Sequence, residues 1–290
     1  MEDILKLITE ETFIISDTHF QHRNILEFEP CRLTQMRIDG YEANEHDKWL
    51  IDNWNAVVNK EDLVLHLGDF SFKQLVNKEI TLSLYRRYRE YTKSSIIHIC
   101  QNNVIVTISD LIDYNGEYSG GILDMEEFKS VIKKYTRLEE KDLSDRPEDL
   151  LNGEIIMVLG NHDLKPKNYL NRNITIIDGF YSYIDKNKTV LNKVITPDNL
   201  FSGFIKSFGD KKIMFSHYPV FNKDDWDRKN KMIAPRIKVL ETIFSANSCN
   251  LNIHGHIHSN LSTFKHSKNV STEHIGFRPV KIKTILKEIK

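Results

Sequence analysis

Five short clusters of aspartate, asparagine and histidine are spaced along the chain, and these residue types bind metal ions. The clusters are Asp17-Thr18-His19, Gly68-Asp69, Gly160-Asn161-His162-Asp163, His217 and Gly255-His256-Ile257-His258. Imidazole and carboxylate together suit Mn, Fe, Ni or Zn, whereas Ca and Mg prefer sites of oxygen alone. The set exceeds what one tetrahedral ion can use. Two ions that share a carboxylate account for the surplus, and two ions about 3.5–4 Å apart are the usual clamp for displacement at phosphorus.

The spacing within the clusters indicates how the side chains converge. Asp17 and His19 are two positions apart, as are His256 and His258, so on an extended backbone both side chains of a pair point one way. A glycine precedes the ligand residue in three clusters, and it lets the chain turn and approach an ion closely. A single Asp-x-His is more often a surface feature, so the prediction depends on the whole set.

The elements that must position these clusters are short strands. Apolar runs rich in Ile, Val and Phe, too short for helices, directly precede the clusters at 13–16, 63–67, 155–159, 212–216 and 251–255. Between them lie helical patterns, such as one that begins near Glu45 with Asn44 as its cap; its apolar stripe comprises Leu50, Ile51, Trp54, Val57 and Val58. Strands that alternate with helices predict an α/β protein, in which sites form at the carboxyl ends of the strands.

We expect one domain, 1–290, with an insertion at about 93–150. The insertion contains a β-like run at 104–108, an amphipathic helix capped by Asp124, and a second helix from Pro147 to the Asn152-Gly153 stop. The buried face of the first helix comprises Met125, Phe128, Val131, Ile132, Tyr135 and Leu138. Just before the insertion, the basic and aromatic stretch 84–93 is either a nucleic-acid contact or, as we favour, an amphipathic helix.

Composition sets broad limits. The chain has 290 residues, of which 40% are hydrophobic and 28% charged, which is ordinary for a globular protein, and its net charge of -1 gives no general attraction to nucleic acid or membrane. Three scattered cysteines, Cys31, Cys100 and Cys249, fit a reducing compartment. No signal peptide or membrane span is evident. We therefore expect a cytoplasmic protein; its oligomeric state stays open.

The order D-x-H, G-D, G-N-H-D, H and G-H-x-H resembles the calcineurin-like metallophosphoesterase superfamily. The flanking segments ISDTHFQHRNIL, WLIDNWNAVVNKEDLVLHLGDFSF and NIHGHIHSN with KNVSTEHIGFRPV are similar to a small bacterial and phage-type branch of it. The resemblance implies a four-layer α/β fold in which two mixed β-sheets pack as a sandwich with helices on both outer faces.

The resemblance also implies roles for individual residues. Two groups of three residues would each bind one divalent transition-metal ion, manganese being favoured over iron, nickel or zinc: Asp17, His19 and His258 for the first, and Asn161, His217 and His256 for the second. Asp69 would bridge the two ions. His162 would donate a proton to the leaving group, while a hydroxide held between the ions attacks phosphorus in line.

The chain also departs from many relatives. Where they have G-D-x-x-D-R-G, this chain has Phe72 in place of the second Asp, which in them orients the histidine of G-N-H. This weighs against the protein-phosphatase branch and leaves His162 without an obvious orienting carboxylate. His22, Asn24 and Arg278 are further candidates for substrate binding, with a polar loop or a surface ion pair as the plain alternative. For His254 we favour core packing.

The function expected is hydrolysis of a phosphate ester, with a phosphodiesterase acting on a nucleotide-like substrate as first choice. A metal-dependent nuclease, with nucleic acid as partner, and a small-molecule phosphomonoesterase are alternative enzymes. A scaffold stabilised by metal is the alternative without catalysis. We expect no membrane partner.

Overall fold

The computed structural model describes residues 1–22, 24–71, 78–86, 89–100, 103–107, 122–123, 137–142, 147–163, 174–184, 190–194 and 202–289. The chain divides into two compact units. The first comprises Met1–Phe72 and Pro147–Lys290, and the second comprises Lys73–Arg146. All five metal-binding clusters therefore belong to the first unit.

One sheet of the first unit has five strands and is mixed. Its order is β16 (Val280–Lys281), β1 (Phe13–Ile15), β2 (Leu63–His66), β8 (Glu154–Met157) and β9 (Ile174–Ile176). Neighbours from β1 to β9 run parallel, and β16 is antiparallel to β1. The three central strands are almost wholly buried, which explains why their sequences are continuous apolar runs instead of alternating patterns.

The other sheet of this unit has six strands and is also mixed. Its order is β11 (Val190–Val194), β10 (Phe180–Ile184), β12 (Gly203–Phe208), β13 (Lys211–Ser216), β14 (Leu251–His254) and β15 (Ser267–Asn269). β13, β14 and β15 run parallel, whereas β12 is antiparallel to β13. The five strands expected from apolar runs are thus confirmed as β1, β2, β8, β13 and β14.

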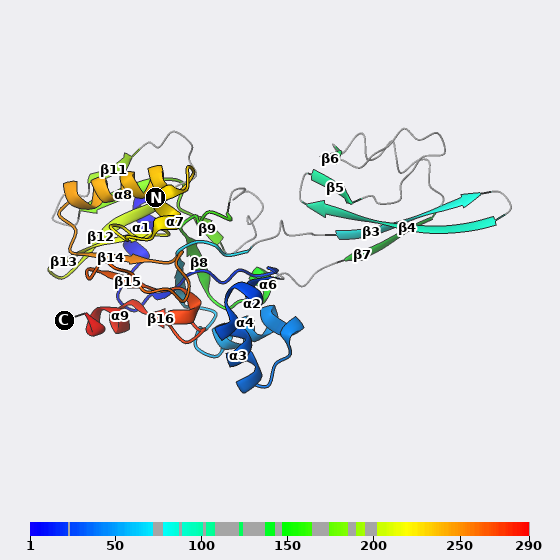
Figure 1. Cartoon of the computed structure of the whole chain (residues 1–290), viewed down its shortest axis with the longest axis horizontal. Coiled ribbons are helices and arrows are strands. Elements are labelled where there is room, and N and C mark those ends of the chain that lie inside the picture. Colours follow the sequence, from blue (N-terminus) through cyan, green and yellow to red (C-terminus); the bar gives the residue numbers. More distant parts are fainter. Residues whose placement is uncertain are drawn as a thin grey trace. The chain divides into compact units, whose positions relative to one another are not determined.

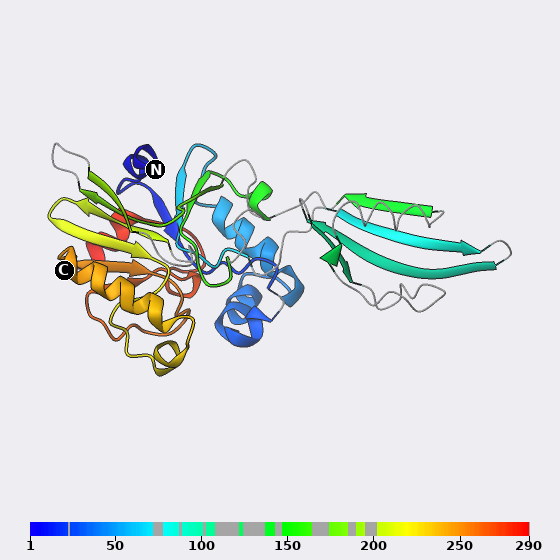
Figure 2. The same ribbon diagram turned by 90° about the horizontal axis from the view of Figure 1, so that it is seen from above.

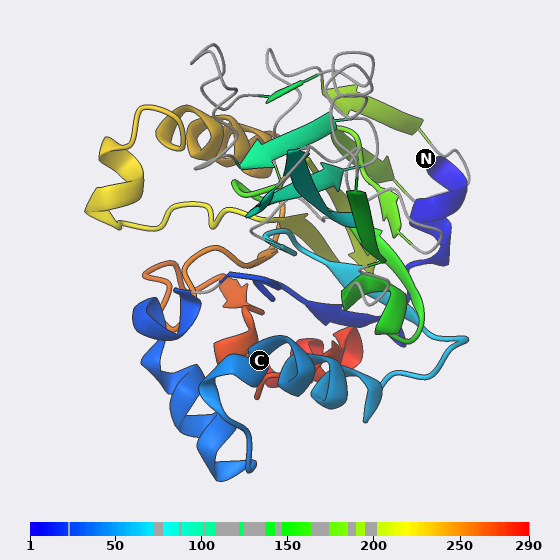
Figure 3. The same cartoon turned by 90° about the vertical axis from the view of Figure 1, so that its right-hand side faces the viewer.

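Helices lie on the outer side of each sheet, with α8 on one side of the sandwich and α3, α4 and α9 on the other (Figures 1 and 3). The predicted two-sheet α/β sandwich is confirmed. The helices are α1 (Glu2–Leu7), α2 (Ile25–Phe28), α3 (Pro30–Ile38), η1 (Ala43–Glu45), α4 (His46–Asn55), α6 (Pro147–Leu150), α7 (Asp225–Lys229), α8 (Ala234–Ala246), η3 (Thr272–His274) and α9 (Ile282–Glu288). None of the helices described is long and apolar enough to cross a membrane.

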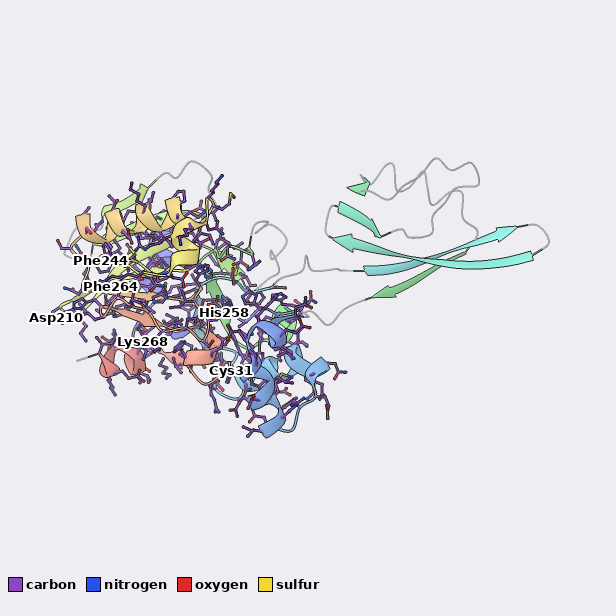
Figure 4. The ribbon with its side chains drawn as sticks, in the orientation of Figure 1. Cys31, Asp210, Phe244, His258, Phe264 and Lys268 are labelled. Atoms are coloured by element: carbon purple, nitrogen blue, oxygen red, sulfur yellow. The ribbon has the colours of Figure 1, made fainter. Side chains whose placement is uncertain are left out.

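The core between α8 and its sheet is built from apolar side chains such as Ile237, Leu240, Ile205 and Met214. Phe244 of α8 lies with its ring centroid 5.8 Å from that of Phe264 (Figure 4). Burial of a side chain of this size contributes roughly 1.5–3 kcal/mol. This packing fixes the sheet whose strands β13 and β14 lead into the segments that carry His217 and His256.

The helix expected near Glu45 exists, but its cap differs from the prediction. Asn44 lies inside η1, and a capping box forms instead between Glu42 and Glu45. The predicted stripe is only partly buried: Leu50, Trp54 and Val58 are buried, and the other two members are half-buried. Trp54 donates through Nε1 to the Asn152 carbonyl, which ties α4 to the segment after α6.

The second unit contains a five-stranded sheet of its own, in which every pairing is antiparallel (Figure 2). Its order is β6 (Ile122–Leu123), β5 (Asn103–Thr107), β4 (Arg89–Cys100), β3 (Lys78–Arg86) and β7 (Arg137–Asp142). The β-like run at 104–108 is confirmed as β5, but the helix favoured for 84–93 is wrong, because the described residues of this stretch, 84–86 and 89–93, lie in β3 and β4 with Leu84 opposite Tyr91.

Three further predictions concern the insertion. The expected range, 93–150, overlaps with the second unit, which begins earlier, at Lys73. The expected amphipathic helix lies mostly outside the described residues, but Leu138, placed at its end, is wrong as a helical position because it lies in β7 opposite Leu82. The second helix begins at Pro147 as predicted and is short.

Candidate metal centre

Five of the seven candidate ligands follow the strands in left-handed backbone conformations. The φ angles are 57° at Asp17, 50° at His19, 54° at Asp69, 72° at His256 and 47° at His258. Left-handed non-glycine residues are uncommon and cluster at functional sites. The expectation of extended i, i+2 pairs is therefore wrong in its geometry, although each pair does converge on one cluster.

The loops that carry these residues are joined by backbone hydrogen bonds. The Asp17 N–H donates to the Gly68 carbonyl at 3.0 Å, and the His19 N–H donates to the Asp69 carbonyl at 3.0 Å. Gly255 donates to the His217 carbonyl at 3.0 Å. The residues after β1 and β2 are thus fixed to one another, as are those after β13 and β14.

Glycine is required where these loops approach one another. A Cβ at Gly160 would clash with the Asp69 carboxylate, and a Cβ at Gly255 would clash with Ser16 and the Asp17 carboxylate. Glycine is therefore needed at both positions for the close approach of neighbouring loops, whereas the predicted close approach to an ion stays a prediction.

The first cluster comprises Asp17, His19 and His258, whose candidate ligand atoms lie within 4.8 Å of one another. Asp17 Oδ1 lies 4.0 Å from His19 Nε2 and 3.8 Å from His258 Nε2. Both Asp17 Oδ1 and His19 Nε2 are buried without a hydrogen-bond partner among the described residues. Leaving such atoms unsatisfied costs roughly 1–3 kcal/mol each, which a bound cation would recover.

The second cluster brings together Asp69, His217 and His256, with Asn161 between the two histidines. Asn161 Oδ1 lies 3.0 Å from His217 Nε2 and 3.0 Å from His256 Nδ1. The two ring nitrogens are 3.2 Å apart. Three potential ligand atoms therefore converge on one point.

Asp69 joins the two clusters. Its Oδ2 lies 3.5 Å from His19 Nε2 of the first cluster and 3.5 Å from His217 Nε2 of the second. Its Oδ1 accepts the His162 backbone N–H at 2.9 Å. A single buried carboxylate thus faces both groups, as a ligand shared by two ions must.

Hydrogen bonds on the outer side assign the tautomers of three histidines. The His217 Nδ1–H donates to the Leu67 carbonyl at 2.8 Å, the His256 Nε2–H to Asp227 at 2.9 Å and the His258 Nδ1–H to Glu273 at 3.2 Å. The nitrogen of each ring that faces inward is then free to bind a metal ion. The donor set fits two transition-metal ions.

The electrostatics of the cluster also favour a cation. Burial alone would lower the pKa of His217, but the Asp69 carboxylate raises it to about 9. Burial holds the pKa of His19 well below its usual range, although Asp69 opposes this. His217 therefore attracts a proton where His19 has a neutral ring, and metal binding displaces such a proton.

Outer partners that the sequence did not reveal support both clusters. Glu273 Oε1 accepts from His258 and from buried Arg32, whose Nε lies 2.7 Å away, and the Arg32 guanidinium also donates to the Asp17 and Thr18 carbonyls. Burial alone would raise the pKa of Glu273, but Arg32 lowers it well below its usual range. Asp227 has the corresponding place beside His256. Glu273 lies in the flanking segment KNVSTEHIGFRPV, but the sequence assigned none of these residues a role.

Asp163 supports the loop after β2 that carries Asp69, which we call the bridging loop. Its buried carboxylate accepts the backbone N–H groups of Asp69 at 2.7 Å, Gly160 at 2.8 Å and Phe70 at 3.2 Å. Burial and the nearby Asp69 charge raise the pKa of Asp163 to about 7. The sequence placed Asp163 in a cluster without assigning it a role, and its contacts are those of a loop support.

His162 lies beside the clusters but is more exposed. Its Nε2 is 3.9 Å from Asp69 Oδ2, and its ring centroid is 5.3 Å from that of His19. The His22 ring lies 6.4 Å from His162 and 5.8 Å from Phe28, a largely exposed aromatic that sequence reasoning missed. Phe72, where a carboxylate is absent, lies outside the described residues.

The remaining candidates are placed apart from the ligands. Asn24 is exposed at the start of α2, and Arg278 is exposed beyond η3; neither has a recorded contact with the two clusters among the described residues. His254 is fully buried on β14 and donates to the Gly255 carbonyl at 2.8 Å, in keeping with the core position that the sequence favoured.

Fold and site together define a class, an α/β sandwich that carries a candidate dinuclear metal centre at the ends of its strands. The model of the calcineurin-like phosphoesterase family matches residues 12–260. The chain belongs to this family.

Two individual proteins are also similar. An uncharacterized protein of Methanocaldococcus jannaschii is 42% identical over 57 residues, which are 20% of this chain and 28% of that protein. The match thus spans about a quarter of that relative. The crystal structure of a protein of unknown function from Aquifex aeolicus shares 22% identity with a TM-score of 0.49, over 96% of this chain and 98% of that one.

Proposed function

We propose that this phosphoesterase is a phosphodiesterase that acts on a nucleotide-like substrate with two divalent transition-metal ions, manganese being favoured. The position of Asp69 carries the proposal, because its Oδ2 lies 3.5 Å from a histidine of each cluster. A shared carboxylate between two sets of nitrogen and oxygen ligands suits a pair of ions acting on one phosphate.

The residues divide into two ligand sets around Asp69. Asp17, His19 and His258 would hold one ion, and Asn161, His217 and His256 the other. Ions bound there would neutralise the phosphate and activate water for attack at phosphorus. The chain itself fixes ring orientation through Glu273 and Asp227 and keeps the ligands in a buried setting, where electrostatic interactions are strong.

His162 would protonate the leaving oxygen. Its ring lies beside Asp69 and His19 without belonging to either ligand set, and its side chain is 36% exposed, so a substrate can reach it. A general acid contributes roughly 10²–10⁴-fold when the leaving group is a poor one.

A substrate panel with added manganese tests the proposal. The panel comprises cyclic nucleotides, dinucleotides, bis-p-nitrophenyl phosphate, nucleoside monophosphates and single-stranded DNA. We expect the nucleotide diesters to be hydrolysed in preference to the other members of the panel. A chelator that removes the metal ions should abolish this hydrolysis. Preference for monophosphates or for DNA would instead indicate a phosphomonoesterase or a nuclease, and no metal-dependent turnover on any member would indicate a scaffold.

We also propose that the inserted unit selects among substrates, since a segment of this length within a domain is often functional. Replacement of Lys73–Arg146 by a short glycine-serine linker should change the ranking of the panel while bis-p-nitrophenyl phosphate is still cleaved. An unchanged ranking in a folded, active variant would show that the unit is not a specificity element.

A further inference from the structure

A cavity of about 590 Å³ opens beside the candidate metal centre, and its use is not explained by the ligands alone. His256 and His258, one from each ligand set, line it. Asp227, which accepts from His256 at 2.9 Å, also lines it. Cavities of this size commonly hold small organic ligands, and a phosphate group alone needs much less space.

The outer walls are two loops held together by side-chain hydrogen bonds. Asn222 Oδ1 accepts both the N–H and the hydroxyl of Thr263 at 3.1 Å, and the Lys223 N–H donates to Thr263 Oγ1 at 2.9 Å. Arg228 donates to the Asn222 carbonyl at 2.6 Å. The cavity is therefore preformed, which lowers the entropy cost of binding.

These bonds leave both a donor and an acceptor for a ligand. Because Asn222 Oδ1 is already used, its amide N–H₂ is the group that remains, and among the described residues it has no recorded partner. Asn260 donates through Nδ2 to the Ile257 carbonyl at 2.9 Å, so its Oδ1 remains. Leu261, 81% exposed, adds an apolar surface to the same wall.

The charges of the cavity disfavour a second phosphate. Asp224 and Asp227 contribute two carboxylates, whereas Lys223 contributes one ammonium group, so the formal balance of these three is one negative charge. A phosphate placed there would meet like charge at short range. Amide donor, amide acceptor and apolar surface instead match an uncharged polar group with a flat face.

We propose that this cavity binds the nucleoside of the substrate, while the esterified phosphate lies at the metal centre. The inference rests on the proposed function and specifies the substrate as one phosphate attached to an uncharged nucleoside. Leu261 contacts the base or sugar face, and the side chains of Asn222 and Asn260 hydrogen-bond its polar edge. Polyphosphorylated nucleotides with the second phosphate in this cavity are disfavoured.

Two esters with the same leaving group isolate the nucleoside. Thymidine 5′-(p-nitrophenyl phosphate) and methyl p-nitrophenyl phosphate are compared in the wild type, Leu261→Ala and Lys223→Ala, with Met232→Ala as a matched control that removes an exposed apolar side chain not lining the cavity. Leu261→Ala should lower kcat/KM for the thymidine ester about three- to tenfold, from lost apolar contact. The methyl ester should stay within about twofold.

The variants distinguish a nucleoside from a phosphate as the group that occupies the cavity. A large loss in Lys223→Ala with none in Leu261→Ala would overturn the proposal in favour of a phosphate subsite. Equal effects of Leu261→Ala on both esters, or none on either, would also overturn it while leaving the phosphodiesterase activity intact.

Direct binding separates the inference from the proposed function. Calorimetric titration with thymidine 5′-monophosphate and with methyl phosphate needs no turnover. If neither ester is hydrolysed, the phosphodiesterase proposal fails, yet tighter binding of thymidine 5′-monophosphate that weakens in Leu261→Ala would still support the cavity as a nucleoside site. Equal affinity for the two ligands would overturn it.

Discussion

The two halves of the candidate metal centre are held in different ways. In the first half, His258 is oriented by Glu273, which is itself neutralised by Arg32, a residue 241 positions away that is fully buried. In the second half, His217 is oriented by the Leu67 carbonyl, and His256 by Asp227 on the short helix α7, beside the cavity. The first half thus depends on a buried ion pair, and the second on a backbone carbonyl and a buried carboxylate on a short helix.

The two halves also differ in whether their ligand atoms have hydrogen-bond partners. In the first half, Asp17 Oδ1 and His19 Nε2 are buried and without partners among the described residues, whereas in the second half Asn161 contacts both histidines. An unsatisfied buried acceptor gains more from a cation than one that has already found a partner. We infer that the first half binds its ion more tightly, and that the second half exchanges its ion more readily.

The largest expected effect comes from removing what the two halves share. Asp69→Asn should reduce bound metal from about two ions per chain to below one and lower phosphodiesterase activity by at least about 10³-fold, more than the roughly 10–100-fold typical of outer-partner changes. Elemental analysis and turnover measure this. A variant that keeps two ions would contradict the shared role.

Removing one histidine from each half should separate the two sites. His258→Ala should empty the first site and His256→Ala the second, each leaving about one ion per chain. Because the first half offers unsatisfied acceptors, the ion left in His256→Ala should resist a chelator longer than the ion left in His258→Ala. Chelator-release kinetics check this, and the opposite order would refute the inferred difference in affinity.

His162 should matter according to the leaving group. His162→Asn should slow an alkyl or ribose ester by roughly 10²–10⁴-fold and a p-nitrophenyl ester much less, because only the former needs a proton. Metal content should be unchanged. Equal losses on both esters would mean that His162 stabilises charge in the transition state instead of donating a proton.

The outer partners allow a matched test of the two halves. Glu273→Gln should destabilise the fold by about 3 kcal/mol, because Arg32 is left buried without its counter-charge. Asp227→Asn should leave stability nearly unchanged and weaken metal binding at the second site by roughly 10–100-fold. Thermal unfolding and metal titration measure both. Similar losses of stability in the two variants would contradict the distinction.

The smallest expected effect concerns the contact between the first half and the bridging loop. His66 is fully buried, where Nδ1 accepts the Gly68 N–H at 3.2 Å and Nε2 lies 3.1 Å from Thr18 Oγ1. Burial lowers the pKa of His66 to about 3, so between that pH and the ordinary value near 6.5 the unfolded chain binds the extra proton. The free energy of unfolding should therefore fall by ~2 kcal/mol from pH 7.5 to 5 through this residue.

Denaturant unfolding at several pH values measures this slope. His66→Asn should remove it, whereas His266→Asn, which changes an exposed histidine, should keep it. An identical slope in wild type and His66→Asn would show that another group governs acid stability.

Several features could be predicted from the sequence because their causes are local. Ligand types, their order, and the apolar runs before them identify an α/β protein and the residues available to bind metal, since a buried strand and a close glycine leave their mark in adjacent positions. Gly160 is such a mark, because any Cβ there would meet Asp69. The two-sheet sandwich and the division into two ligand sets were implied by the resemblance to the family. The stretch 84–93 shows where prediction from the sequence fails. Its tyrosines and arginines fit a helix or a strand, and the pairing between β3 and β4 makes it a strand.

Only the tertiary structure decided how the ligands are held. The left-handed backbone at Asp17 and His19 follows from hydrogen bonds to the loop after β2, and the tautomer of His258 follows from Glu273 and Arg32. The sequence determined which atoms were available to bind metal. Which nitrogen faces inward depends on partners brought together by packing between residues far apart in the chain, and such contacts have no periodicity or motif from which they could be read.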